Sequence, residues 1–231
     1  MAQPLIYQRW PAKNPDVIQL YALNTPNGMK VSIALEEMEL EYEPHTVNIL
    51  EGDQFTEEFK SVNPNSKIPA ILDPNGPGGK PLTIMESGAI LIYLAEKSGK
   101  LMPMDPVLKN ECMQWLFFQV GHVGPMFGQF GHFYKFANEK CKDPYPTERY
   151  ATETRRLLAV IDHQLENKPY ILGDEYTIAD ISMFPWVNTL ITFYGAADYL
   201  KMNEYPKLQS WLKSCLERPA SLEGSDVCSL N

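Results

Sequence analysis

Apolar runs and amphipathic stretches alternate over the first hundred residues of the chain. Short strand-like runs occur at 17–21, 42–47, 70–72 and 82–84. After the first run, one helical face is formed by Val31, Ala34, Leu35 and Met38. A second, short helix is expected to end near Ser61, and a third to begin after Glu86-Ser87-Gly88. This order of elements predicts a small sheet with helices, and Pro44 inside the second strand predicts an edge position for it.

From Leu108 onward the pattern becomes helical and rich in Trp, Phe, Met and Leu. Leu157, Leu158, Ile161 and Leu165 form one apolar stripe of a helix. Trp115, Phe117 and Phe118 have helical spacing and are expected in the core. Thr177 and Asp180 have the spacing of a helix-capping pair, in which each side chain bonds the backbone near the other. The nearly continuous apolar residues 181–187 predict that this helix is buried at the centre of its domain.

These patterns predict an N-terminal extension at 1–16, a thioredoxin-like α/β domain at 17–102 and an all-α domain at 103–231. The helical domain is expected to end in a polar, loose tail from residue 219 onward.

Composition narrows the possible partners of the chain. The 231 residues carry a net charge of −9, which argues against non-specific binding to nucleic acid or to anionic membranes. No apolar run approaches the roughly 20 residues of a membrane helix, and the N-terminus lacks the apolar core of a secretory signal. The four cysteines have neither CxxC nor metal-site spacing, which favours a cytoplasmic protein with free thiols and no metal.

The turn Thr25-Pro26-Asn27-Gly28 lies between the first strand and its helix. A thioredoxin-type fold carries its reactive cysteines at this turn, but this chain has none there. Thr25 offers a hydroxyl, Asn27 an amide, and the helix start offers backbone N–H groups. Any sulfur chemistry at this turn must therefore use sulfur from a ligand.

Three further features suggest what that ligand is. Ile68-Pro69 enters a strand, where a cis bond would expose the Ile68 backbone for strand-like pairing with a peptide. Ser87, at a helix start, suits a carboxylate, and Glu86 suits an ammonium group. Gln54 lies in the loop before the second helix. Together they predict a pocket for a short peptide with one free amino-carboxylate end.

Over residues 17–220 the chain resembles the cytosolic glutathione transferases, and among them most the bacterial Nu class and the related yeast prion-forming nitrogen regulator. The matching segments are Thr25-Pro26-Asn27-Gly28, Gly52-Asp53-Gln54-Phe55, residues 63–69, Glu86-Ser87-Gly88, Gly131-His132-Phe133 and Glu148-Arg149-Tyr150.

The resemblance implies a homodimer in which Thr25 and Asn27 contact the glutathione sulfur. The implied glutathione-binding residues are Gln54, Lys67, Ile68, Pro69, Glu86, Ser87 and Arg149, the last from the partner subunit. A co-substrate pocket is expected at Trp115, Met126, Phe127 and His132. The catalytic Tyr or Ser common in the family is not evident, although Tyr21 lies near the first strand end.

We expect a glutathione-dependent reductase of small disulfides that acts through the thiolate of bound glutathione, with organic hydroperoxide reduction as a further activity. Two alternatives stay open: conjugation of glutathione to hydrophobic electrophiles, and a regulatory protein that binds glutathione without turnover. The second is disfavoured because the yeast regulator has a long Asn-rich N-terminal segment, whereas about sixteen residues precede the first predicted strand here.

Overall fold

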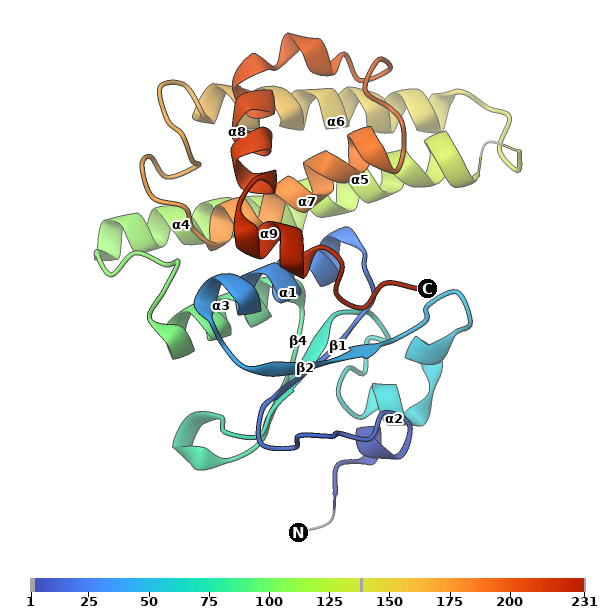
Figure 1. Cartoon of the computed structure of the whole chain (residues 1–231). Helices are drawn as coiled ribbons and strands as arrows, with labels where there is room; N and C mark the ends of the chain where they lie inside the picture. The colour runs from blue at the N-terminus through green and yellow to red at the C-terminus, as the bar shows by residue number, and fades with distance from the viewer. Residues whose placement is uncertain (1–2, 138, 231) are drawn as a thin grey trace. The chain divides into compact units, whose positions relative to one another are not determined.

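The computed structural model describes residues 3–137 and 139–230 (Figure 1). Its contacts divide the chain into two compact units, which are described separately. The first combines the residues up to Lys100 with those from Pro219 onward, and the second is Leu101–Arg218. No helix in the described ranges has the length and apolar character needed to cross a membrane.

The first unit is built on a four-stranded mixed sheet in the order β2-β1-β3-β4. Its strands are β1 (Ile18–Ala22), β2 (Tyr42–Thr46), β3 (Ala70–Asp73) and β4 (Leu82–Met85). β1 pairs in parallel with β2 and antiparallel with β3, which pairs antiparallel with β4. β2 is an edge strand, as its internal Pro44 predicts, because proline lacks the N–H that a central strand needs.

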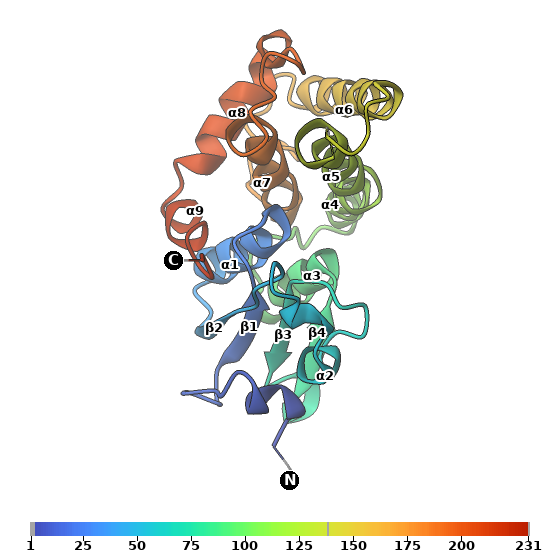
Figure 2. The ribbon, with the colours of Figure 1, turned by 90° about the vertical axis from the view of Figure 1, so that its right-hand side faces the viewer.

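The α-helices among the described residues of this unit are α1 (Pro26–Met38), α2 (Glu57–Lys60), α3 (Ser87–Ser98) and α9 (Pro219–Gly224). α1 packs against both α3 and α9 (Figure 2). Thr25 caps α1, since its hydroxyl accepts a hydrogen bond from the Gly28 N–H at 3.3 Å, and Pro26 occupies the first helical position. The predicted thioredoxin-like α/β domain is confirmed.

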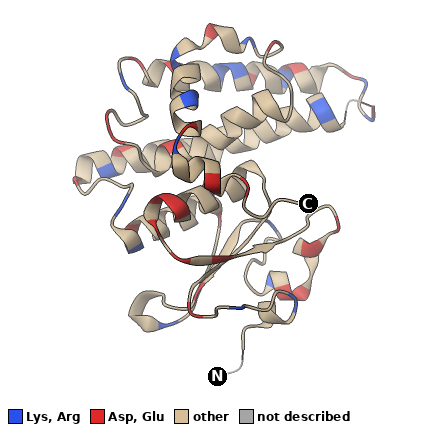
Figure 3. Cartoon of the chain, in the orientation of Figure 1, with Lys and Arg blue, Asp and Glu red and all other residues tan. Residues whose placement is uncertain are grey.

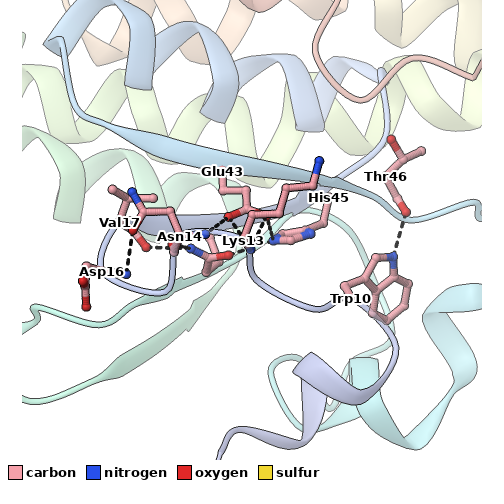
Figure 4. Close-up of polar contacts among 9 residues, drawn as sticks. Trp10, Lys13, Asn14, Asp16, Val17, Glu43, His45 and Thr46 are labelled. Atoms are coloured by element: carbon pink, nitrogen blue, oxygen red, sulfur yellow. Dashed lines mark hydrogen bonds and ion pairs between the residues drawn. The ribbon is translucent and has the colours of Figure 1, made fainter.

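Residues 5–14 pack on this sheet as a strap. Ile6 has no exposed surface and joins the core cluster with Tyr21 and Phe59. The Trp10 indole N–H donates to the Thr46 carbonyl at 2.9 Å, and the backbone N–H groups of Lys13 and Asn14 donate to the Glu43 carboxylate (Figure 4). The segment that the sequence sets apart as an extension therefore belongs physically to the α/β unit.

The segment from Pro219 onward also differs from the sequence-based expectation of a loose tail on the helical domain. Its helix α9 packs on α1, where the Ser32 hydroxyl donates to the Gly224 carbonyl at 2.7 Å. A side chain at Gly224 would lie 2.7 Å from the Ile33 backbone, so only glycine allows this approach. Beyond α9, the Asn24 N–H donates to the Cys228 carbonyl at 3.2 Å.

The second unit is all-helical, as predicted. It contains α4 (Pro106–Phe118), α5 (Gly124–Gly131), α6 (Tyr145–Gln164), α7 (Ile178–Thr192) and α8 (Pro206–Leu216). α7 is buried along nearly its whole length, contacts α4, α5 and α8, and begins with the predicted capping box of Thr177 and Asp180. Phe117 differs from the expectation of a core residue, because 62% of its surface is exposed on the outer face of α4.

Charge is distributed over both units. Figure 3 shows Lys and Arg residues scattered among Asp and Glu residues along the ribbon. In that view the basic residues do not gather into one patch. Together with the net charge of −9, this distribution gives no support to binding of nucleic acid or anionic membranes.

Candidate functional site

A cavity of about 190 Å³ opens in the first unit where the start of α1, the segment before β3 and the start of α3 come together. It is lined by Asn27, Asn63, Asn65, Lys67, Ile68, Pro69, Glu86 and Ser87. Six of these eight were proposed from the sequence, and they come from three separate segments. The fold therefore gathers the motif residues at one place.

Asn27 brings its amide to the cavity from the first turn of α1. The first N–H groups of a helix have no partner within the helix, and they give this end a partial positive charge. Thr25 lies just before this turn, half-buried, and its hydroxyl caps the helix. Thr25 is not among the residues that line the cavity, although its hydroxyl keeps its own hydrogen for a second bond.

The segment before β3 is held in place by a buried asparagine. The Asn63 amide donates to the Lys67 carbonyl at 2.6 Å, and its oxygen accepts from the Asn65 N–H at 2.9 Å. The Ile68–Pro69 peptide bond is cis. The sequence analysis did not propose Asn63 as a site residue. Its only signal there was its position just before Lys67-Ile68-Pro69, the segment whose backbone it holds in place.

The start of α3 contributes Glu86 and Ser87. Glu86 has a φ of 70° and a ψ of 117°, a backbone conformation that residues with side chains rarely adopt. Its carbonyl accepts the first hydrogen bond of α3, from the Ile90 N–H at 2.9 Å. Such conformations cost roughly 1–3 kcal/mol and cluster at ligand sites, so this strain supports a functional role for the α3 start.

A lysine that sequence reasoning missed forms hydrogen bonds with two of the residues that line the cavity. Lys30 on α1 is only 1% exposed, and its Nζ donates to Asn27 Oδ1 at 2.8 Å and to Ser87 Oγ at 3.2 Å. Burial lowers the pKa of this amine to about 7, and the nearby Glu86 carboxylate opposes that effect. The signal in the sequence was its spacing of three residues from Asn27, which places the two side chains on the same side of α1.

Gln54 lies in a short 3-10 helix (Asp53–Phe55) that its neighbour Asp53 holds in place, and it is not among the residues that line the cavity. The Asp53 carboxylate accepts from the Asn48 N–H at 2.9 Å and pairs with Arg9 of the N-terminal strap. The Gln54 amide nitrogen donates to the Ile49 carbonyl at 3.3 Å. Its amide oxygen is buried and has no partner within residues 3–137 and 139–230.

Tyr21 points into the core of the first unit. It has no exposed surface, and its ring stacks on His45 with centroids 4.8 Å apart. Burial raises the pKa of its hydroxyl well above the ordinary value, and the nearby Tyr7 and Glu43 add to the shift. In this position Tyr21 cannot act as the ionised tyrosine of the commoner family mechanism.

The remaining predicted residues lie in the second unit. Phe127 is fully buried in its core, whereas His132 is exposed with its ring edge-on to Phe133 at 5.0 Å. Trp115 is half-buried and packs edge-on against Phe118 at 5.3 Å, and Met126 is half-buried on α5. Arg149 is exposed near the start of α6. Their roles stay predictions.

The cavity can therefore offer amide and hydroxyl donors, two helix starts, one carboxylate and one exposed ammonium group. These suit a small peptide that carries both charges and a sulfur atom. Among the described residues, no group of three or more His, Cys, Asp or Glu side chains is arranged to hold a metal ion.

Several known proteins are similar to this chain in sequence and in structure. Residues 25–97 match the glutathione S-transferase N-terminal domain, and residues 125–219 match the C-terminal domain. Disulfide-bond oxidoreductase YfcG of Escherichia coli strain K12 is 43% identical over 206 residues, which cover 89% of this chain and 93% of that protein.

Two crystal structures of Pseudomonas proteins are similar over nearly the whole chain. One is a glutathione transferase family member from Pseudomonas fluorescens with two glutathione bound, with a TM-score of 0.96, 50% identity and coverage of 98% of this chain and 100% of that one. The other is a glutathione transferase from Pseudomonas putida with one glutathione disulfide bound per subunit, with a TM-score of 0.94, 50% identity and coverage of 96% of each chain. Since the two domain matches together span most of the sequence, the chain belongs to the glutathione S-transferase family.

Proposed function

We propose that this protein reduces small disulfides with the thiolate of bound glutathione. The observation that carries the proposal is the cysteine-free cavity, which joins an amide at the start of α1 to a carboxylate and a hydroxyl at the start of α3. Two relatives add support. YfcG is named a disulfide-bond oxidoreductase, and the Pseudomonas putida structure holds glutathione disulfide.

In this proposal the ligand lies along the cavity from sulfur to amino-carboxylate end. Thr25 and Asn27 donate to the sulfur, and the Ile68 backbone pairs with the cysteinyl unit beside Pro69. Glu86 binds the ammonium group of the γ-glutamyl end, and Ser87 with the α3 start binds its carboxylate. Lys67 and Gln54 approach the glycine end, where Lys67 supplies the positive charge.

The chemistry needs a thiolate at neutral pH. A free thiol has a pKa near 8.5 and is mostly protonated at pH 7. Two hydrogen-bond donors at a helix start stabilise the thiolate over the thiol, and we expect them to lower the pKa of the glutathione thiol by about one to two units. Each unit corresponds to about 1.4 kcal/mol.

The thiolate then attacks one sulfur of the substrate disulfide and forms a mixed disulfide. The other sulfur leaves as a thiolate and takes up a proton. A second glutathione thiolate attacks the glutathione sulfur of the mixed disulfide, which releases the second substrate thiol and glutathione disulfide. Two glutathione molecules are oxidised for each disulfide reduced. With an organic hydroperoxide, the same thiolate attacks the terminal oxygen and breaks the O–O bond, and the alcohol leaves after taking up a proton. The resulting glutathione sulfenic acid condenses with a second glutathione to give glutathione disulfide and water.

The protein's own cysteines are poorly suited to this role. Cys112, Cys215 and Cys228 are buried, and burial raises the pKa of the Cys112 and Cys228 thiols to about 11. Cys141 is half-buried in the second unit and is not among the residues that line the cavity, so the proposed nucleophile comes from the ligand. Since the reaction consumes reduced glutathione, the proposal includes a cytoplasmic location, where that pool is maintained. It also includes a homodimer in which Arg149 of each protomer serves the other's site.

The test is glutathione-dependent reduction of a small model disulfide, coupled to glutathione reductase and NADPH consumption. We expect Thr25→Ala and Asn27→Ala each to lower kcat/KM by about 10-fold or more, the change in thiolate fraction that one pKa unit gives. Thr192→Ala and Asn110→Ala, at exposed positions of the helical unit, are matched controls that should keep full activity.

Full activity in both site variants would reject the sulfur assignment. A wild-type protein that conjugates glutathione to an aromatic electrophile but leaves disulfides intact would replace reduction by conjugation. Binding of glutathione with neither reaction would favour the non-catalytic alternative.

A further inference from the structure

Lys30 is an unusual residue for the place it occupies. It lies on a part of α1 whose neighbours Val31, Ile33 and Ala34 have no exposed surface, and it is itself 1% exposed. Removing an amine from water costs free energy unless hydrogen bonds compensate. Lys30 forms two such bonds with residues that line the cavity from different helices, Asn27 on α1 and Ser87 on α3.

The chemistry of the amine fixes how these two partners must point. An ammonium group donates hydrogen bonds and accepts none, so each partner presents an oxygen to it. Asn27 therefore turns Oδ1 toward Lys30, which directs its amide nitrogen, with two N–H groups, elsewhere. Ser87 likewise presents its oxygen to Lys30, so its O–H points away from the amine.

Both residues line the same cavity, so the amide and the hydroxyl that Lys30 binds belong to the proposed ligand site. We propose that Lys30 is a positioning residue that orients the Asn27 amide toward the ligand sulfur and the Ser87 hydroxyl toward the ligand carboxylate. This inference rests on the proposed function, because it uses the same site and ligand. One amine would thus position the donors for both the sulfur and the γ-glutamyl carboxylate of glutathione.

The electrostatics of the bound state agree with this role. Burial lowers the pKa of Lys30 to about 7, and the Glu86 carboxylate already favours its charged form. A thiolate and a carboxylate bound above it would add further negative charge and favour the ammonium group. Only the ammonium form accepts no hydrogen bond, so the orienting role belongs to the charged amine, which a bound ligand of negative charge favours.

The test is a double-mutant cycle between Lys30→Met and Asn27→Ala, read by the thiolate absorbance of bound glutathione at pH 7. Lys30→Met keeps the length of the side chain and removes its donors. We expect it to lower the thiolate fraction about 5- to 10-fold in the wild-type background and to have no further effect in the Asn27→Ala background. Ser87→Ala replaces Asn27→Ala in a second cycle, read by the KM for glutathione.

Two further variants separate orientation from general damage to α1. Ser32→Ala breaks a buried hydrogen bond between α1 and α9, and it should leave the thiolate fraction unchanged. Lys30→Gln keeps one donor nitrogen on a shorter side chain, and it should fall between the wild type and Lys30→Met. This variant also serves if the methionine does not fold.

A normal thiolate fraction in both Lys30 variants would overturn the inference, as would effects of Lys30→Met and Asn27→Ala that simply add. Additive losses would make Lys30 a structural tie between α1 and α3. A wild-type protein that binds glutathione as thiolate but reduces no disulfide would reject the proposed reaction. The thiolate absorbance of the double-mutant cycle could still be measured in that case, so the two failures are distinguishable.

Discussion

The burial of Lys30 should also make the stability of the protein depend on pH, because a buried amine opposes folding most strongly when it is charged. Its pKa is about 7 in the folded protein against an ordinary value of 10.5, so between these pH values the unfolded chain binds a proton that the folded chain does not. The free energy of unfolding therefore rises with pH in this window. The charged amine is at its greatest disadvantage below pH 7.

We expect Lys30→Met to be more stable than the wild type at pH 7 and below, in contrast to its loss of activity. That advantage should shrink by about 1.4 kcal/mol for each pH unit between 7.5 and 9.5. Urea unfolding of both proteins across this range measures the difference, and other titrating groups cancel because they are common to both. A constant difference would show that Lys30 stays charged in the folded protein.

At the residue scale, the sequence was sufficient to locate the site residues that belong to local motifs. Asn27, Ile68 and Glu86 lie in turns or at helix starts, where residue type and backbone conformation are closely linked, and the structure places all three around one cavity. Lys30 was missed because a lysine next to an apolar helical face ordinarily extends to solvent. Only the position of α3 shows that its amine is enclosed.

Among the elements, α7 depends most on one side chain. Asp180 is fully buried, and its two oxygens accept from the backbone N–H groups of Ile171 and Thr177 and from the Trp211 indole N–H, each at 2.9 Å. One carboxylate thus connects the start of α7 to the preceding loop and to α8. Its removal leaves buried donors without acceptors, which is costly.

Asp180→Ala should therefore destabilise the protein by about 3 kcal/mol or more, whereas Asp174→Ala, at an exposed position six residues earlier, should change stability by less than about 0.5 kcal/mol. Thermal or urea unfolding followed by circular dichroism measures both. A loss near 1 kcal/mol would mean that Asp180 acts as an ordinary exposed cap.

The sequence predicted elements better than the faces they bury. The capping pair and the apolar run at 181–187 identified α7 and its burial, because both signals are local. Phe117 was assigned to the core because α4 carries aromatic residues around its circumference, and spacing alone cannot tell which side is covered. The segment after residue 219 looked loose because its polar composition hides the contacts of Gly224 and Cys228 with the other end of the chain.

At the scale of the whole molecule, the proposed dimer makes Arg149 a test of shared sites. Arg149→Ala should raise the KM for glutathione several-fold, because it removes about one charge-assisted hydrogen bond to the ligand. It should change the stability of the protein little. Arg156→Ala, also exposed on α6 and paired with Glu153, is the matched control. Titration calorimetry gives the affinity and light scattering the mass. An unchanged affinity, or a monomer with full activity, would remove Arg149 from the site.

The fold class and its order of elements were predictable because alternating strand and helix patterns, followed by helices alone, allow few architectures. What no local pattern contains is the pairing of distant segments. The strap of residues 5–14 along β2 and the placement of α9 on α1 are both of this kind.

The position of α9 reverses the order in which the two units can be completed during synthesis. The α/β unit comes first in the sequence, yet its helices include residues 219–224. These residues follow the whole helical segment Leu101–Arg218 in the sequence. A ribosome has therefore finished Leu101–Arg218 before α1 can meet α9. The glycine at 224, which admits that contact, is thus among the last residues that the first unit requires, and until it emerges the nascent α/β unit exposes the face of α1 around Ile33.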